Sequence, residues 1–231
     1  MTTKLNLKFP GNIAICGSTM SGKTYLTKRL IREQLLNEMD YIVILSPTTT
    51  LSGDFDEYNA TPKNHNPTPG HPSIYKASNN FRKVISELVE GNTRLKEDKE
   101  IPRKEIPNIA LILDDMVGHS LLKFNGFVDK LSTKSRHLNI SIIVLAQRIT
   151  AIPRTFRLNC KYTILFNITN FTELERFVQE CVPKNLRTKL NDHIPDIYDT
   201  PYNFIVCHNF ATKISERMKV NGITPIQEYL T

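Results

Sequence analysis

Short runs of apolar residues recur along the chain, and each ends at a glycine or a polar residue. Uninterrupted runs of Val, Ile and Leu predict strands that are buried on both faces. Between these runs, apolar residues recur every three or four positions, which predicts amphipathic helices. The predicted strands are residues 12–16, 41–45, 72–76, 109–113, 140–146, 162–166 and 203–207. The predicted helices are residues 25–39, 79–90, 121–137, 171–181 and 184–190.

The alternation of strands and helices predicts an α/β fold with a mainly parallel core sheet that is flanked by helices. Right-handed crossovers would bring the carboxyl ends of the parallel strands to one edge. We expect the last strands, near Tyr162 and Asn203, to run antiparallel at an edge of the sheet. The length of 231 residues favours a single domain, residues 1–231, with its core at about residues 10–210.

Two segments are predicted to be surface loops. Residues 46–71 are rich in proline, threonine, asparagine and glycine, and we expect only a short helix there, near residues 54–58. Residues 92–107 are dense in charges of both signs, which indicates a mobile, solvated connection.

Composition and charge narrow the class of protein. The net charge of +7 modestly favours a polyanionic partner. No apolar run approaches the roughly 18 residues of a membrane span, so we predict none. The N-terminal sequence MTTKLNLKFPG alternates too quickly for a signal-peptide core, which favours a cytoplasm-like compartment and a protein that is not secreted. The cysteines lack the close spacing of a zinc site and are interpreted as small buried residues: Cys16, Cys160, Cys181 and Cys207.

Residues 17–24, with the sequence GSTMSGKT, match the phosphate-binding pattern G-x-x-x-x-G-K-[S/T] completely. They lie between a predicted strand and a predicted helix, which is the context that the motif requires. Backbone N–H groups and the positive end of the helix would bind the phosphates of ATP. Lys23 would neutralise the β- and γ-phosphate oxygens, and the Thr24 hydroxyl would bind Mg²⁺. The residues assigned to the nucleotide are Gly17, Ser18, Thr19, Met20, Ser21, Gly22, Lys23 and Thr24.

Polar residues follow two further predicted strands. Asp114 and Asp115 end the run IALIL, and Gln147 ends the run ISIIVLA. We assign Asp114 to Mg²⁺, through the water ligands of the metal, and Asp115 to the attacking water as general base, a role in which glutamate is commoner. In additional-strand P-loop ATPases, the strand that ends in such a glutamine lies between the Walker A and Walker B strands. We therefore predict that Gln147 senses the γ-phosphate.

Residues 109–166 contain the series IALILDD, SRHLNIS, IIVLAQ, RTFRLN and YTILF. This series resembles the genome-packaging ATPases of nucleocytoplasmic large DNA viruses and virophages, which belong to the FtsK–HerA superfamily of P-loop NTPases. The resemblance extends over about residues 10–210. It implies an additional-strand, RecA/FtsK-like fold and an enzyme that couples ATP hydrolysis to the translocation of double-stranded DNA into a preformed capsid.

The resemblance also implies partners and a location. We expect a ring homo-oligomer, pentameric or hexameric, that contacts double-stranded DNA and capsid vertex proteins. It would work in a viral factory of the host cytoplasm or in the virion, with ATP and Mg²⁺ as cofactors. DNA contacts should be mainly to phosphates, through Lys or Arg side chains on pore-facing loops, near Lys123 or Lys130.

A ring ATPase needs a cation that the neighbouring subunit delivers to the γ-phosphate. Arginine suits this role because it stays charged and its planar fork matches phosphate. Four arginines lie between the predicted strands 109–113 and 162–166: Arg136, Arg148, Arg154 and Arg157. Arg136 is the first candidate for this trans-acting arginine, since it lies at the end of the helix predicted after Asp115. Arg157 and Arg154 come next.

Three other functions use a similar phosphate loop. The nearest alternative is another DNA-translocating or helicase-type P-loop ATPase on the same scaffold. A nucleotide or small-molecule kinase is the second, and it would need an acceptor pocket and a lid and would ignore added DNA. The third is a non-catalytic protein that binds ATP to hold a ring together, which a single-turnover hydrolysis assay would identify.

Overall fold

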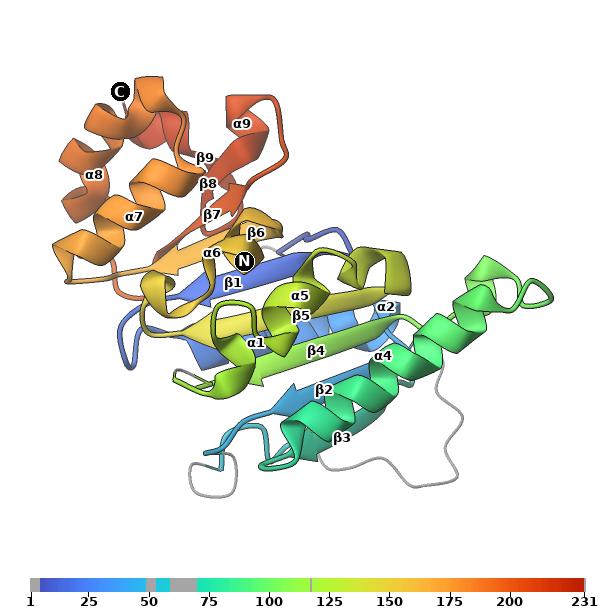
Figure 1. Ribbon diagram of the computed structural model, residues 1–231. Coiled ribbons are helices and arrows are strands. Elements are labelled where there is room, and N and C mark those ends of the chain that lie inside the picture. The colour runs from blue at the N-terminus through green and yellow to red at the C-terminus, as the bar shows by residue number, and fades with distance from the viewer. Residues whose placement is uncertain (1–4, 49–52, 59–69, 117, 231) are drawn as a thin grey trace.

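One sheet runs through the computed structural model, which describes residues 5–48, 53–58, 70–116 and 118–230 (Figure 1). Over these residues the sheet has nine strands, in the order β3–β2–β4–β5–β1–β6–β7–β8–β9. The strands are β1 (Asn12–Cys16), β2 (Tyr41–Leu45), β3 (Ser73–Ala77), β4 (Ile109–Asp114), β5 (Ile140–Ala146), β6 (Cys160–Phe166), β7 (Phe204–His208), β8 (Met218–Val220) and β9 (Thr224–Pro225). All seven predicted strands are therefore present.

The six strands from β3 to β6 in this order are parallel, and β7, β8 and β9 are antiparallel to their neighbours. The predicted mainly parallel core is thus confirmed. The expectation of an antiparallel strand is confirmed for β7 but wrong for β6, which pairs in parallel with β1. The sheet also continues past the predicted core limit near residue 210, because β8 and β9 extend it beyond β7.

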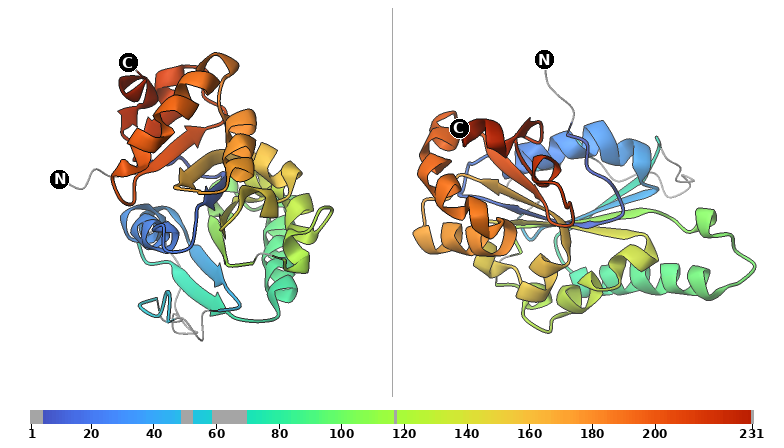
Figure 2. Two further views of the ribbon diagram at one scale, coloured as in Figure 1. Left: turned by 90° about the vertical axis from the view of Figure 1, so that its left-hand side faces the viewer. Right: turned by 90° about the horizontal axis from the view of Figure 1, so that it is seen from above.

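Helices cover both faces of the sheet (Figure 2). On one face, α1 (Lys23–Leu30), a π-helical turn (Ile31–Leu35) and α2 (Leu36–Glu38) follow one another without a break, as predicted for residues 25–39. The opposite face carries further helices. These are α4 (Phe81–Glu97), α5 (Phe127–Ser132), α6 (Arg154–Leu158), α7 (Phe171–Cys181) and α8 (Arg187–Asp199). A short helix, α9 (Ile214–Arg217), precedes β8.

The central strands divide the core into two apolar layers. In β1, Ala14 and Cys16 pack in the layer beneath α4 to α8, whereas Ile13 and Ile15 pack in the layer beneath α1. This alternation follows from the two-residue period of a strand. Because both faces are covered, every residue of β1, β4 and β5 is buried. Only the ends of these strands can present polar groups to a ligand.

The predicted loop at residues 92–107 is wrong in its first part, where α4 continues to Glu97. Asn92 is buried, and its Nδ2 donates to the backbone oxygens of Pro107 at 3.0 Å and Leu138 at 2.7 Å. These bonds join the helix to two segments that are distant in the sequence. The local charge density therefore does not decide the structure of this segment.

Other predicted elements differ in extent. The helix predicted at residues 121–137 is divided into a 3₁₀ turn (Ser120–Leu122), α5 and a second 3₁₀ turn (Ser135–Leu138). The helix expected near residues 54–58 is wrong, because these residues form hydrogen-bonded turns with Phe55 fully buried. Residues 49–52 and 59–69 of that predicted loop lie outside the described residues. The helix predicted at residues 184–190 begins as a 3₁₀ turn and continues as α8 to Asp199.

All four cysteines are buried, as their apolar surroundings predict. None of the helices in the described ranges combines the length and the apolar character needed to span a bilayer.

Candidate active site

The phosphate loop lies between β1 and α1, at the carboxyl edge of the parallel strands. Two backbone bonds hold its beginning: Gly17 N donates to Ala146 O at 3.2 Å, and Ser18 N donates to Asn167 O at 3.1 Å. The loop is therefore attached to the ends of β5 and β6, the two strands that flank β1. Its position is fixed by main-chain atoms on both sides.

The geometry of the loop fits a phosphate ligand. A Cβ at Gly17 would lie 2.5 Å from Phe166 Cβ and 2.6 Å from Ser21 Oγ, and Gly22 has a φ of +104°, so both positions require glycine. The Ser21 hydroxyl is buried and has no hydrogen-bond partner among the described residues. The first turn of α1 lacks a side-chain cap, which leaves its N–H groups for an anion.

Lys23 is the cation of this loop. Its Nζ donates to Gly17 O at 2.8 Å and to Ser18 O at 2.7 Å, so the ammonium group lies across the loop. Burial lowers the pKa of Lys23, while the negative charge of Asp114 opposes that shift. A charge that is half-buried and close to a carboxylate is well suited to interact with phosphate oxygens.

Asp114 is the last residue of β4 and is buried, with 8% of its surface exposed. Burial, with the like charge of Asp115 as the next cause, raises the pKa of Asp114 to about 6. Ser46, which follows β2, donates its hydroxyl to Asp114 Oδ2 at 3.5 Å. Ser46 was not among the predicted site residues, although its place directly after a buried strand is the signal that could have identified it.

Asp115 and Gln147 are exposed residues at the same edge. Asp115 follows β4 in a left-handed conformation with a φ of 51°, and Gln147 follows β5. Because β5 pairs with β4 on one side and β1 on the other, Gln147 lies between the phosphate loop and the two aspartates. The predicted order of Walker A, sensor and Walker B strands is therefore confirmed. Thr24 and Asp114 carry oxygen atoms of the kind that Mg²⁺ prefers as ligands.

Arg136 lies on the opposite edge of the sheet. It belongs to the 3₁₀ turn that precedes the amino end of β5, and its side chain is exposed. The neighbouring Ser135 donates its hydroxyl to Asn12 Oδ1 at 2.9 Å, at the first residue of β1. Within one chain the structure therefore does not bring Arg136 to the phosphate loop.

Arg157 is engaged inside the chain. Its guanidinium forms two bonds of 2.7 Å to the carboxylate of Glu180 and also donates to the backbone oxygens of Ile149 and Ile152. Glu173 accepts from Thr150 N at 2.9 Å. The segment after Gln147 is therefore held firmly against α7.

A groove of about 510 Å³, which we call the basic groove, lies between the segment after Asp115 and the segment after Gln147. Three exposed cations line it: Lys123, Arg148 and Arg154. None of them forms an ion pair with another described residue. Phe124, which is 73% exposed, lies at the same groove. Lys130, the other predicted DNA contact, is exposed on α5 but does not line it.

The raised pKa of Asp114 predicts a stability cost. Because the pKa rises from 3.8 to about 6, the native state binds the proton more tightly than the unfolded state. The ionised carboxylate therefore lowers the free energy of unfolding as the pH rises from about 4 to about 6, and the full cost persists above that window. At pH 7.5 without Mg²⁺, Asp114→Asn should raise the free energy of unfolding by about 1–3 kcal/mol.

Urea unfolding at pH 7.5 and pH 4 measures this effect. The advantage of Asp114→Asn should disappear at pH 4, where the wild-type carboxyl group is protonated. Asp192→Asn, at an exposed position on α8, is the matched control and should change little at either pH. An Asp114→Asn variant that is no more stable than the wild type at pH 7.5 would contradict a raised pKa of Asp114.

The fold and this site define a P-loop NTPase fold of the additional-strand, RecA/FtsK-like type. A family model described as "Poxvirus A32 protein" matches residues 2–197, and the chain belongs to this family. Its relatives include the DNA packaging protein OPG160 of Variola virus and of Vaccinia virus (strain Copenhagen), each 29% identical over 185 residues that cover 78% of this chain. The match spans 62% of the length of these relatives.

Solved structures share the fold. The genome packaging NTPase B204 from Sulfolobus turreted icosahedral virus 2, in complex with AMPPCP, has a TM-score of 0.61 at 15% identity, over 91% of this chain and 96% of that chain. The same NTPase in complex with sulfate has a TM-score of 0.63 at 15% identity, over 93% and 96%. The cytoplasmic domain of the Type VII secretion ATPase EccC from Thermomonospora curvata gives 0.58 at 16% identity, over 91% of this chain and 25% of that chain.

Proposed function

We propose that this chain is an ATPase that drives double-stranded viral DNA into a preformed capsid. The observation that carries the proposal is the convergence of the phosphate loop, Asp114, Asp115 and Gln147 on one edge of the sheet. Membership of the A32 family and the names of the DNA packaging relatives favour packaging over another DNA-translocating or helicase-type activity. The solved relatives with bound nucleotide analogues support an NTPase.

In this mechanism the chain binds Mg·ATP through its loop and strand ends. The backbone N–H groups of residues 17–24 would donate to the phosphate oxygens, and the ammonium of Lys23 would neutralise part of their charge. Thr24 and Asp114 would hold Mg²⁺, which when bound would supply positive charge to the phosphoryl oxygens. Asp115 accepts a proton from the attacking water, and the Gln147 amide hydrogen-bonds the γ-phosphate.

The proposed assembly is a ring of identical subunits, pentameric or hexameric, in a viral factory of the host cytoplasm or in the virion. Arg136 of one subunit would stabilise the γ-phosphate in the site of its neighbour. Its place on the far edge of the sheet fits a role between subunits, because it cannot act within its own site. Capsid vertex proteins would receive the DNA-loaded ring.

The basic groove is the proposed contact with DNA phosphates. It is formed by the segments that directly follow Asp115 and Gln147, so a displacement of either residue on hydrolysis would move the groove. Its three exposed cations have no intramolecular partner among the described residues and are available to phosphate oxygens. Contacts of this kind do not depend on base sequence, as a packaging motor requires.

DNA binding tests this function. Duplex DNA should stimulate ATP hydrolysis, whereas a nucleotide kinase would ignore it. Lys123→Gln and Arg148→Gln should each lower the slope of log Kd against log salt concentration by about 0.9, because each removes one phosphate contact with duplex DNA. Fluorescence anisotropy of labelled duplexes measures the slope.

The control is Lys189→Gln, which removes the same charge from an exposed position on α8. It should leave the slope unchanged. Equal slopes in the groove variants and in the control would mean that DNA binds elsewhere on the chain. ATP hydrolysis that is not stimulated by duplex DNA would count against a DNA motor.

A further inference from the structure

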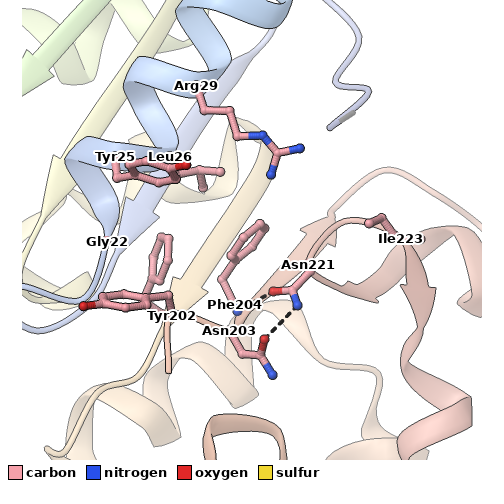
Figure 3. A pocket seen from close by; sticks show the side chains of 10 residues that line it. Gly22, Tyr25, Leu26, Arg29, Tyr202, Asn203, Phe204, Asn221 and Ile223 are labelled. Atoms are coloured by element: carbon pink, nitrogen blue, oxygen red, sulfur yellow. Dashed lines mark hydrogen bonds between the residues drawn. The ribbon is translucent and has the colours of Figure 1, made fainter. Parts of the chain in front are cut away.

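A second hollow adjoins the phosphate loop (Figure 3). It lies on the β6 and β7 side of β1, away from the strand that carries the aspartates. It has a volume of about 650 Å³, within the usual range of small-molecule sites. Gly22, Tyr25 and Arg29 line it from the loop and α1, Tyr202 lines it from the turn before β7, and Asn221 lines it from the turn after β8. We call it the α1–β7 pocket. Gly22 belongs to both this pocket and the phosphate loop.

A triphosphate bound to the loop would place its nucleoside end toward this pocket. Asp114, Asp115 and Gln147 follow β4 and β5, which lie on one side of β1, whereas β6 and β7 lie on the other side. The γ-phosphate must approach Asp115 and Gln147. The rest of the nucleotide then extends across the loop in the opposite direction, toward β6 and β7, where the α1–β7 pocket lies.

Aromatic rings form the wall beside the loop. A Cβ at Gly22 would lie 3.3 Å from Phe166 Cε1 and 3.3 Å from Tyr202 Cδ1, so these rings lie directly against the phosphate loop. Phe166 is buried, but Tyr202 is 71% exposed and Tyr25 is 68% exposed. Exposed aromatic faces next to a phosphate site are suited to stacking on a nucleobase.

The backbone of Tyr202 adopts a conformation that favours glycine. Its φ is 65°, which is uncommon for a bulky residue and costs free energy. The side chain is largely exposed, so burial of its ring in the core does not offset that cost. A ligand that stacks on the ring gives a reason for a tyrosine at this position.

The amide side chains of the pocket are already engaged. Asn221 Nδ2 donates to Asn203 Oδ1 at 2.8 Å, and Asn203 Nδ2 donates to Ile197 O at 2.8 Å. Asn221 Oδ1 accepts from Phe204 N at 3.0 Å. These bonds use one N–H of each amide and hold both side chains in place, which leaves the exposed rings as the larger contact surface for a base. The tyrosine hydroxyls can donate or accept, and therefore do not distinguish adenine from guanine.

We propose that the α1–β7 pocket binds the nucleoside of the triphosphate by stacking on Tyr202 and Tyr25, and that it accepts adenine and guanine nucleotides with similar affinity. This inference rests on the proposed NTPase function and names the substrate class of the same site. The phosphates contribute the same binding free energy in ATP and GTP. Stacking on the tyrosine rings adds a contribution that either purine base can make.

Calorimetric titration of the full chain with Mg·ATP, Mg·GTP and Mg·tripolyphosphate tests the proposal. The Kd values for ATP and GTP should agree within about threefold, since stacking tolerates either base. Tyr202→Gly should weaken both by about 5- to 100-fold, because it removes one stacking face. The same variant should leave tripolyphosphate binding unchanged, and Tyr202→Phe should retain nucleotide binding.

Tyr202→Gly should not lower the melting temperature, because glycine adopts a positive φ without strain. Tyr75→Ala, which removes a 49% exposed tyrosine from β3, is the matched control and should not change nucleotide affinity. A preference for ATP over GTP above about 30-fold, or an unchanged affinity in Tyr202→Gly, would overturn the inference, given the size of a stacking contribution.

Tripolyphosphate separates this failure from failure of the proposed function. If Lys23→Ala abolishes tripolyphosphate binding while Tyr202→Gly leaves ATP binding unchanged, the phosphate loop is correct and the nucleoside binds elsewhere. If Lys23→Ala leaves the binding of both ligands intact, the phosphate-loop assignment and the proposed NTPase are wrong, together with the pocket that depends on them.

Discussion

Lys23→Ala should abolish ATP hydrolysis and weaken nucleotide binding without unfolding the protein. The ammonium group lies across the loop, on the oxygens of Gly17 and Ser18, where it would neutralise the β- and γ-phosphates. Loss of such a group from a preorganised site lowers the turnover rate by at least about 10²–10³-fold. Single-turnover hydrolysis measures the chemical step, and thermal unfolding tests whether the fold is retained.

The fold should tolerate this substitution because Lys23 is only half-buried and burial already lowers its pKa. Lys23→Arg keeps the charge but brings a bulkier, planar group, so it should restore part of the binding and little of the turnover. Lys28→Ala removes a lysine further along the same helix and should leave hydrolysis unchanged. Undiminished turnover by Lys23→Ala would defeat the assignment of the phosphate loop.

Arg136→Ala should lower the turnover rate by about 10³–10⁵-fold if the residue acts between subunits. The guanidinium would stabilise charge on the γ-phosphate of the adjacent subunit, so its loss damages a site whose own loop is intact. In mixtures with the wild type, activity should fall more steeply than the fraction of mutant. Steady-state hydrolysis across a mixing series measures this dependence.

A complementation experiment sharpens the test. Arg136→Ala subunits have an intact phosphate loop, and Lys23→Ala subunits have an intact Arg136, so a mixture of the two inactive variants should recover part of the activity. Lys134→Ala, at an exposed neighbouring position, is the control for a simple loss of surface charge. Strictly proportional loss, with no recovery in the mixture of variants, would argue against Arg136 as the trans-acting arginine.

The edge that carries the candidate site could be predicted from the sequence because the phosphate loop, the two aspartates and Gln147 lie at the ends of buried strands. Parallel pairing then places the ends of β1, β4 and β5 together, whatever the intervening helices do. Lys23, Asp114 and Gln147 are therefore found near one another, as the pattern predicts. Ser46 obeys the same rule after β2 and was missed only because serine commonly begins a loop.

The α1–β7 pocket could not be predicted in this way. Its residues come from α1, from the turn at Tyr202 and from the turn at Asn221, which no local motif links. The extension of α4 to Glu97 could not be predicted either, because the bonds of Asn92 to Pro107 and Leu138 are tertiary contacts. The short helix α6 was also missed, because a segment of five residues carries too little periodicity to separate a helix from a turn.

The placement of Arg136 has a consequence for how copies of this chain can associate. The phosphate loop and Arg136 occupy opposite edges of the sheet, so a contact that joined them in the proposed head-to-tail ring would pair two different surfaces. In such an arrangement each subunit would give Arg136 to one neighbour and receive it from the other, and an open row of subunits would leave the site at one end incomplete. Closure into a ring would complete every site. Hydrolysis per subunit should consequently rise with protein concentration and level off once closed cycles predominate.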